Sequence, residues 1–286
     1  DDGEGALTAT QTFTIVVTTV NDAPVAVADI ATVSEDAATT SFDVIANDTD
    51  EEEDTLTLTL VNTSGTGTVA INSDGVSVDY TPAVDFNGTE VITYTVSDGI
   101  LTDETGILKV TVTPVNDTPI AVSDTETVLE DAATTSINVV GNDTDADEDT
   151  LVLESVTTAG SGIVAVNSNG VSVDYTPALN FNGSEIITYT VSDGTDTATG
   201  TLTVTVTPVD DAPVAVEDEL TVIEDANLTS KNVIENDTDV DQDTLTLTEV
   251  SYTGDGIVAV NSDNVSIDYT PAADYDGTET ITYTVS

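Results

Sequence analysis

The chain has 286 residues and a formal net charge of −53, because 55 Asp and Glu stand against two Lys, with no Arg and no His. Such a charge repels nucleic acid and anionic membrane surfaces, so we expect neither as a partner. The absence of Cys and His also removes disulfides, thiol nucleophiles, imidazole bases and the usual zinc or copper sites.

Alternating apolar and polar residues run through the sequence at 55–60, 76–80 and 107–113. This period of two is typical of strands with one buried face. No long apolar stripe at helical spacing appears, and no apolar run approaches the roughly 20 residues of a membrane-spanning helix. The sequence therefore predicts an all-β protein without membrane insertion, although its charge alone would also allow a disordered acidic polymer.

One unit of about 95 residues recurs along the chain, a length common for a single β-sandwich domain. Its markers are the linker pairs Asn21-Asp22, Asn116-Asp117 and Asp210-Asp211, and the tyrosines Tyr94, Tyr189 and Tyr283. We expect repeats at 21–115, 116–209 and 210–286, the last without its final strand. Residues 1–20 match the last strand of a repeat, either as part of a preceding repeat or as a donor strand for another subunit.

The first repeat shows the expected order of elements. Strands are predicted near 25–33, 40–46, 55–62, 68–72, 76–80, 90–97 and 105–113. Gly75 closes a hairpin turn, and Pro82 ends a strand. Tyr80, Phe86 and Tyr94 are expected in the core. Seven short strands at this spacing predict tandem Greek-key sandwiches, cadherin-like or immunoglobulin-like, and linkers with two prolines each predict that they lie end to end as a rod.

An acidic ladder occurs once in each repeat, and every second residue in it is a carboxylate. Like charges so close together repel strongly unless a cation lies among them, and the chain has only two Lys. Calcium is the hard cation that suits flexible sites with many oxygen ligands. The predicted ligands are Asp48, Asp50, Glu52 and Asp54; Asp143, Asp145, Asp147 and Asp149; and Asp237, Asp239, Asp241 and Asp243.

Two other interpretations of the ladder are weaker. Its Asp-x-Asp-x-Asp start resembles an EF-hand loop, but Glu53, Glu148 or Gln242 stands where that loop needs Gly, and a strand follows in place of a helix. A solvated charge run is simpler still, yet such runs have no reason to keep an alternating register three times. The sequence therefore favours a cation site on a β-sandwich loop.

Several motifs of the repeat are those of a known family. They are Val-Asn-Asp-Ala-Pro from residue 20, Val-x-Glu-Asp from residue 33, the ladder, Phe-Asn-Gly from residue 86 and Tyr-Thr-Val-Ser-Asp-Gly from residue 94. Together they resemble the cadherin-like tandem repeats of large bacterial surface proteins and adhesins. The resemblance covers all 286 residues.

In cadherins, calcium binds where one domain meets the next, and the resemblance implies the same places here. The first internal junction would use Glu35, Asp36, Asn116, Asp117, Asp143, Asp145 and Asp193. The second would use Glu130, Asp131, Asp210, Asp211, Asp237 and Asp239. A junction at the start of the first repeat would use Asn21, Asp22, Asp48, Asp50 and Asp98.

The sequence departs from the cadherin pattern in two places. Thr18 and Thr113 replace the leading Asp of the linker, and one linker position is missing. The acidic tripeptide of the lower loop is reduced to Asp85-Phe86-Asn87, or to Asn180-Phe181-Asn182 in the second repeat. We therefore expect one or two calcium ions per junction, and not three.

These features favour a calcium-stiffened stalk or filament of an extracellular or cell-surface adhesin, whose partners are calcium, neighbouring repeats or further copies of the chain. Polymerisation by strand addition between subunits is part of this hypothesis. An alternative is a module that binds a carbohydrate or a cell-surface partner, which would need exposed aromatic residues such as Tyr252 or Tyr275 beside a pocket. An enzyme is not expected, because carboxylates repeated in every domain favour architecture over catalysis.

Overall fold

A computed structural model describes residues 9–286, apart from the side chains of residues 104 and 105. Residues 1–8 of the expected N-terminal strand lie outside the described residues. The chain forms two compact units, of which the first runs to Pro119 and includes Asp145–Thr150. The second comprises Ile120–Thr144 and Leu151–Ser286. The described residues contain strands and no helix, so the all-β prediction is confirmed.

Seven strands form the first repeat: β1 (Asp29–Ser34), β2 (Thr40–Asp43), β3 (Thr57–Thr63), β4 (Thr68–Ile71), β5 (Ser77–Thr81), β6 (Gly88–Ser97) and β7 (Thr102–Thr113). Each overlaps a strand predicted from the alternating pattern. One sheet has the order β1-β7-β6-β3 and the other β2-β5-β4. Only β1 and β7 run parallel; the remaining pairs are antiparallel. This is a Greek-key sandwich.

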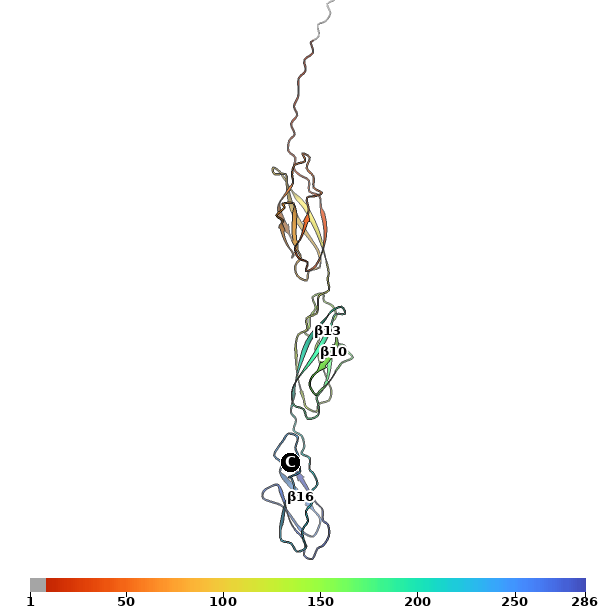
Figure 1. Ribbon diagram of the computed structural model, residues 1–286, viewed down its shortest axis with the longest axis vertical. Coiled ribbons are helices and arrows are strands. Elements are labelled where there is room, and N and C mark those ends of the chain that lie inside the picture. The colour runs from red at the N-terminus through yellow and green to blue at the C-terminus, as the bar shows by residue number, and fades with distance from the viewer. Residues whose placement is uncertain (1–8) are drawn as a thin grey trace, which may run out of the picture. The chain divides into compact units, whose positions relative to one another are not determined.

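The second repeat copies this arrangement with β8 (Asp124–Leu129), β9 (Thr135–Asn138), β10 (Val152–Thr158), β11 (Ile163–Val166), β12 (Ser172–Thr176), β13 (Gly183–Ser192) and β14 (Thr197–Thr207). Its sheets have the orders β10-β13-β14-β8 and β11-β12-β9. Figure 1 shows β10 beside β13 in the green part of the chain, in agreement with their antiparallel pairing.

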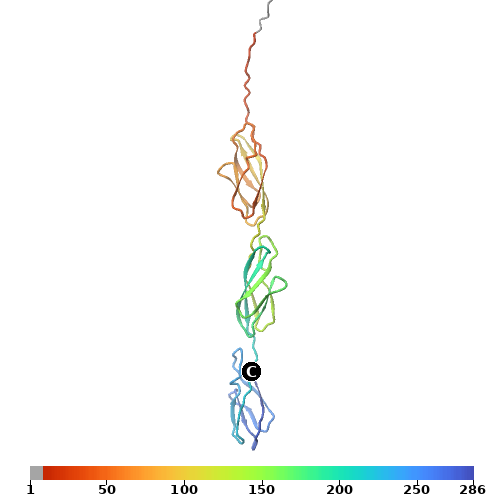
Figure 2. The same ribbon diagram turned by 45° about the vertical axis from the view of Figure 1, so that its right-hand side comes forward.

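The third repeat has five strands in the described part of the chain: β15 (Thr229–Asn232), β16 (Leu247–Tyr252), β17 (Ile257–Val260), β18 (Ser266–Thr270) and β19 (Ile281–Val285). One sheet, β15-β18-β17, has three strands as in the other repeats, whereas the other contains only β16 and β19 within residues 9–286. Figure 2 shows this repeat in blue. Residues 218–223, which correspond to β1, form no strand. The reason is that β1 pairs only with β7, and this repeat has no counterpart of β7 within residues 9–286.

Apolar side chains of facing sheets form the core of each sandwich. The core clusters of the first and second repeats each contain eleven buried hydrophobic residues, and that of the third contains three, because within residues 9–286 one of its sheets has two strands in place of four. Tyr80 and Tyr94 are fully buried and Phe86 packs against the same core cluster, as predicted. Tandem sandwiches are therefore confirmed; their end-to-end arrangement stays a prediction.

In the first and second repeats, a glycine of the last strand lies directly against the buried tyrosine of the preceding strand. A Cβ added at Gly106 in β7 would lie 2.2 Å from Cε2 of Tyr94, and one at Gly200 would lie 2.2 Å from Cζ of Tyr189. Cβ atoms cannot approach aromatic carbons so closely. Glycine at this register position therefore lets the tyrosine ring lie flat against the neighbouring strand.

We predict that Gly106→Ala lowers the free energy of unfolding of the first repeat by about 1–3 kcal/mol, because the buried Tyr94 ring must shift. Urea unfolding monitored by tyrosine fluorescence measures the change. Thr111→Ala, at an exposed position of the same strand, is the control and should change it by less than about 0.5 kcal/mol. Equal losses in the two variants would contradict the packing argument.

Candidate metal centre

The acidic ladder of the first repeat folds into a tight turn between β2 and β3. Asp50 Oδ1 accepts the backbone N–H groups of Glu52 and Asp54, both at 3.0 Å. Glu53, the sixth position of the loop, has a φ of 59°. A residue that is not Gly rarely adopts this left-handed conformation, which costs roughly 1–2 kcal/mol. The turn therefore wraps the backbone of Glu52 and Asp54 around the carboxylate of Asp50.

The same turn occurs in the other ladders. Asp145 Oδ1 accepts the N–H groups of Asp147 and Asp149, and Asp239 Oδ1 accepts those of Asp241 and Asp243. Glu148 and Gln242 have φ values of 61° and 63°. The sixth residue of each loop therefore has the left-handed backbone that glycine has in an EF-hand loop. A β-strand follows each loop in place of a helix, so the loops are not EF-hands.

A short bridge holds each ladder against the linker that precedes its repeat. Val25 N–H donates to Thr49 O at 2.7 Å, and Thr49 N–H donates to Val25 O at 3.1 Å. The pairs Ile120–Thr144 and Val214–Thr238 form the same bridge. The Thr of the Asn-Asp-Thr-Asp motif therefore fixes where the following carboxylates lie relative to the linker.

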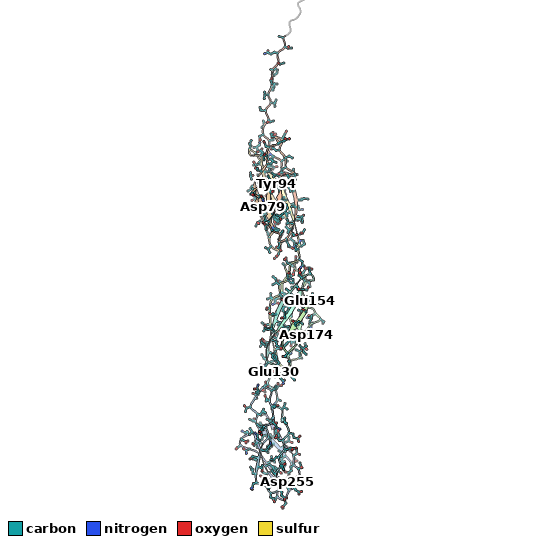
Figure 3. All side chains as sticks on the ribbon, in the orientation of Figure 1. Asp79, Tyr94, Glu130, Glu154, Asp174 and Asp255 are labelled. Atoms are coloured by element: carbon teal, nitrogen blue, oxygen red, sulfur yellow. The ribbon has the colours of Figure 1, made fainter. Side chains whose placement is uncertain are left out.

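The first carboxylate of the ladder faces the sandwich. Asp48 Oδ1 accepts Val27 N–H at 2.7 Å and lies 3.4 Å from the hydroxyl of Tyr94, which is labelled in Figure 3. The same hydroxyl donates to Val44 O at 2.9 Å and contacts Asp29. Burial is the main cause that raises the pKa values of both Asp29 and Asp48. Asp48 therefore has a packing role that the ladder pattern does not reveal.

Three carboxylates meet in the first unit. Glu35, Asp117 and Asp147 each place an oxygen within 4.8 Å of the others. Glu35, at the end of β1, is 3% exposed, and its Oε1 accepts Val115 N–H at 2.5 Å. Asp117 N–H donates to Asp147 Oδ2 at 2.7 Å. The residue after β1, the linker and the second ladder therefore supply one cluster.

A second group shares Asp117. Asp36, Asp85 and Asp117 also bring their oxygens within 4.8 Å, as do Asp145, Asp147 and Asp149 of the ladder. Asp36 and Asp85 both have left-handed backbones, with φ of 56° and 55°, and Asp36 Oδ1 accepts Asp85 N–H at 3.1 Å. Asp85 was not among the predicted ligands. Its recurrence as an oxygen-bearing Asn180 and Asp274 is the signal that would have found it.

Several carboxylate oxygens in these clusters are buried and have no hydrogen-bond partner. In the first unit these are Glu35 Oε2, Asp117 Oδ2 and Asp145 Oδ2, and Asp50 Oδ2 of the first ladder, outside the clusters, is in the same state. A buried, unpartnered carboxylate oxygen is costly, and a nearby like charge increases the cost. A hard cation with oxygen ligands removes both penalties, so the residues present fit calcium.

Asp117 shows the electrostatic cost most clearly. Burial is the first cause that raises the pKa of its carboxyl group above the usual value, followed by repulsion from Asp85, Asp36, Asp147 and Glu35. A raised carboxyl pKa means that the charged form is held unfavourably in this arrangement. A bound cation would instead stabilise the charged form of each of these carboxylates.

The second unit contains a related arrangement. Glu130, labelled at one end of its sandwich in Figure 3, is 3% exposed, and its Oε1 accepts Val209 N–H at 2.6 Å. Asp211 N–H donates to Asp241 Oδ2 at 2.7 Å, and Asp211 Oδ2 is buried without a partner. Asn182 Nδ2 donates to Glu130 Oε2 at 3.3 Å. Here an amide hydrogen bond occupies the glutamate oxygen that is unpartnered at Glu35.

The remaining predicted ligands of the second unit lie in the linker before the third repeat, just after β8 and in the third ladder. Asp210 hydrogen-bonds to Asp243, whose pKa is raised mainly by burial and by the charge of Asp239. Asp131 Oδ1 accepts Asn180 N–H at 2.8 Å. Asp237 is 9% exposed, with Oδ1 bonded to Val216 N–H and Oδ2 unpartnered. These residues therefore repeat the pattern of the first unit.

The carboxylates near the start of the first repeat form half of such a cluster. Asn21 Nδ2 donates to Asp98 Oδ2 at 2.8 Å, and Asp22 N–H donates to Glu52 Oε2 at 3.2 Å. No counterpart of Glu35 precedes them within the described residues. Asp143 and Asp193 belong to the second unit, so their contribution to the cluster around Asp117 stays a prediction.

The family follows from the sequence of each repeat. The model of the bacterial Ig domain matches residues 21–113, 116–207 and 210–286. The chain belongs to the bacterial Ig domain family. The predicted similarity to cadherin-like and immunoglobulin-like tandem repeats is therefore confirmed, and the strands described above are those of Ig repeats.

Solved structures of cadherin repeats share this fold. Human CDH23 EC21-23 superposes with a TM-score of 0.57 at 17% identity, covering 88% of this chain and 91% of that chain. Drosophila N-cadherin EC1-4 gives a TM-score of 0.43 at 16% identity, covering 93% and 75%. At these identities the likeness concerns the fold of the Ig repeats and not their ligands.

Enzymes also occur among the similar structures. Endo-fucoidan hydrolase MfFcnA4 from glycoside hydrolase family 107 gives a TM-score of 0.27 at 20% identity, covering 66% of this chain. The Ig repeats span 28% and 44% of the hydrolase chains in two such structures, and the likeness is too low to carry an argument. No curated protein matches the sequence significantly. Among the described residues, no helix is long and apolar enough to cross a membrane.

We predict opposite effects of Asp117→Asn without and with calcium. Because the folded-state pKa of Asp117 is raised, its carboxyl group favours folding below the unfolded pKa of about 3.9, and this contribution is lost as the pH rises through the folded pKa. In EDTA at neutral pH the variant should therefore melt above the wild type, and the difference should vanish towards about pH 4. With calcium present the variant should melt below it.

Differential scanning calorimetry over this pH range measures both effects. Glu51→Gln is the matched control, because it removes one exposed carboxylate from the first ladder without touching the cluster. If Asp117→Asn and Glu51→Gln shift the melting temperature equally in EDTA and in calcium, the cluster has no special electrostatic role.

Proposed function

We propose that this chain is a structural repeat region of an extracellular or cell-surface adhesin, stiffened by calcium at the linkers between its Ig repeats. The observation that carries the proposal is the cluster around Asp117, where buried oxygens of Glu35, Asp117 and Asp145 have no hydrogen-bond partner. The linker residue Asp117 is shared by two groups of three carboxylates. A cation there would bind to the linker and to both flanking elements at once.

The protein has no positive side chain with which to neutralise this cluster. Its two lysines are Lys109 in β7 and Lys231 in β15. Lys231 Nζ lies 3.4 Å from Asp218 Oδ1, in the third repeat. An external cation is therefore the physical means by which the carboxylates around Asp117 can remain close together at neutral pH.

Calcium fits the ligand set better than other common cations. The candidate ligands are carboxylate oxygens together with the Asn116 amide, and they lie on loops and a linker that can adjust to an irregular shell. Magnesium requires a near-ideal octahedron and keeps several waters, whereas calcium accepts six to eight oxygens at variable angles. Two groups that share Asp117 support one or two ions at this linker.

An extracellular location is consistent with the proposed calcium sites. Extracellular calcium modules have dissociation constants of about 10⁻⁴ to 10⁻³ M, so millimolar external calcium fills them and cytosolic calcium does not. Ions held by Glu35 and Asp85 from the first repeat, Asp117 from the linker and Asp147 from the following ladder would restrict rotation about the linker. Without the ions, repulsion among the same carboxylates would favour bending.

Under this proposal the repeats comprise residues 21–115, 116–209 and 210–286, with residues 1–20 as a last strand. Neighbouring repeats and further copies of the chain are then its partners, through end-to-end packing and strand addition. The carbohydrate-binding alternative gains no support from its expected residues: Tyr252 and Tyr275 are only half-exposed, and the Tyr252 ring packs edge-on against Tyr269, with centroids 6.5 Å apart.

We predict that calcium stabilises and elongates the protein together. At about 10 to 100 times the dissociation constant, each site adds about 1.4–2.7 kcal/mol to the free energy of unfolding. For a domain of this size that raises the melting temperature by roughly 5–20 °C. Calorimetry measures the shift, and small-angle X-ray scattering in EDTA and in calcium measures the maximum dimension, which should increase.

The variant Glu35→Gln should lose most of the calcium effect that arises at the first linker, because it removes a buried ligand charge. Glu154→Gln, at an exposed position of β10, is the control and should retain it. Identical melting and scattering of the wild type in EDTA and in calcium would refute the proposal.

A further inference from the structure

The loop before the sixth strand of a repeat differs at one position between the first two repeats. It contains Asp85 in the first and Asn180 in the second, each with a left-handed φ of 55°. Asp36 Oδ1 accepts Asp85 N–H at 3.1 Å, and Asp131 Oδ1 accepts Asn180 N–H at 2.8 Å. The two loops therefore have the same backbone geometry, but one presents a carboxylate and the other an amide.

At the first linker this carboxylate creates an additional group of ligands. Asp36, Asp85 and Asp117 place their oxygens within 4.8 Å of one another, beside the group of Glu35, Asp117 and Asp147. After burial, repulsion from Asp85 is the largest effect that raises the pKa of Asp117. The charge of Asp85 therefore acts on the linker carboxylate more strongly than any other charge of the cluster.

At the second linker the corresponding group has one carboxylate fewer. Asp131 and Asp211 are present, but Asn180 offers a neutral amide oxygen in place of the charged Asp85. Within residues 9–286, no three carboxylates around this linker place their oxygens within 4.8 Å of one another. Asn180 and Asp211 nevertheless line one pocket, so a cation there would still have the amide oxygen as a ligand.

The buried glutamates of the two linkers differ in the same direction. Glu35 Oε2 is buried without a hydrogen-bond partner, whereas Glu130 Oε2 accepts Asn182 Nδ2 at 3.3 Å. A cation at the first linker meets a carboxylate oxygen that has lost its water and gained nothing in return. At the second linker the cation competes with an amide hydrogen bond. Binding to Glu130 is therefore less favourable than binding to Glu35.

One difference adds a carboxylate to the second linker. Asp210 stands at the position of Asn116, which offsets the charge lost at Asn180. The side chains of Asp210 and Asp243 are hydrogen-bonded to each other. Two carboxyl groups joined in this way share a proton, so the pair has one negative charge less. Asp210 also contacts the following ladder, so it does not replace Asp85, which belongs to the preceding repeat.

We propose that the first linker binds calcium about tenfold more tightly than the second, and that Asp85 and Asn180 set this difference. The inference rests on the proposed function, since it assumes that both linkers bind calcium. Its physical reason is that the affinity of a calcium site rises with the number of charged ligands. As the calcium concentration increases, the first linker becomes stiff while the second still bends. The chain therefore stiffens in two steps.

Pairs of spin labels measure the two linkers separately, because the chain has no Cys of its own. Thr93→Cys with Thr188→Cys spans the first linker, and Thr188→Cys with Thr282→Cys spans the second. The three threonines are exposed and precede the equivalent tyrosine of each repeat, so the pairs are matched. In electron–electron resonance of the whole chain, the distance distribution of the first pair should narrow at about tenfold lower calcium than that of the second.

Reciprocal substitutions test the cause. Asp85→Asn should move the first transition to about tenfold higher calcium, and Asn180→Asp should move the second to about tenfold lower calcium. Both variants should fold, because Asp36 and Asp131 accept backbone N–H groups of these residues and both Asn and Asp tolerate a left-handed backbone. Asn62→Asp, which adds a carboxylate at an exposed position of β3, is the control and should leave both transitions unchanged.

The outcomes separate this inference from the proposed function. If both linkers stiffen at the same calcium concentration, or the second stiffens first, the inference is overturned and the proposed function is left intact. Transitions that do not move in Asp85→Asn and Asn180→Asp would overturn the inference in the same way. Distance distributions that remain equally broad in EDTA and in millimolar calcium for both pairs would overturn the proposed function together with the inference.

Discussion

The repulsion among carboxylates around Asp117 is the constraint on which the structure depends. Hydrophobic burial explains the first two sandwiches, whose cores contain eleven buried apolar residues each, but it does not explain why Glu35 lies buried with one oxygen unpartnered. Unlike an apolar contact, this arrangement is unfavourable in isolation and becomes favourable with a cation. Under the proposed function, the linkers of such a chain would respond to calcium, while its sandwiches are stable through their apolar cores.

Much of the architecture could be predicted because strands with one buried face have a period of two. The seven strands of the first repeat lie where the alternation places them. The third repeat could not be treated in the same way, since residues 218–223 have the right composition but, within residues 9–286, have no parallel partner such as β1 has in β7. A strand at a sheet edge is determined by its neighbour as much as by its own residues.

The residue types of the candidate site could be predicted from the sequence, but the contact that each residue makes could not. Alternating carboxylates indicated a cation site, yet the pattern could not show that Asp48 turns towards Tyr94 while Asp50 organises the turn. Asp85 was recognised only as a remnant of the cadherin tripeptide and not as a ligand, because its counterpart in the second repeat is the uncharged Asn180. Its left-handed backbone and its bond to Asp36 become visible only when the loop is folded.

The most direct test of the account is a crystal structure of the protein grown in millimolar calcium. The account predicts calcium at the first linker, with oxygens of Glu35, Asp117 and Asp147 at about 2.3–2.6 Å from it. If calcium-saturated crystals instead contained only water among these carboxylates, or held Asp117 turned away from Glu35, the central claim would be contradicted.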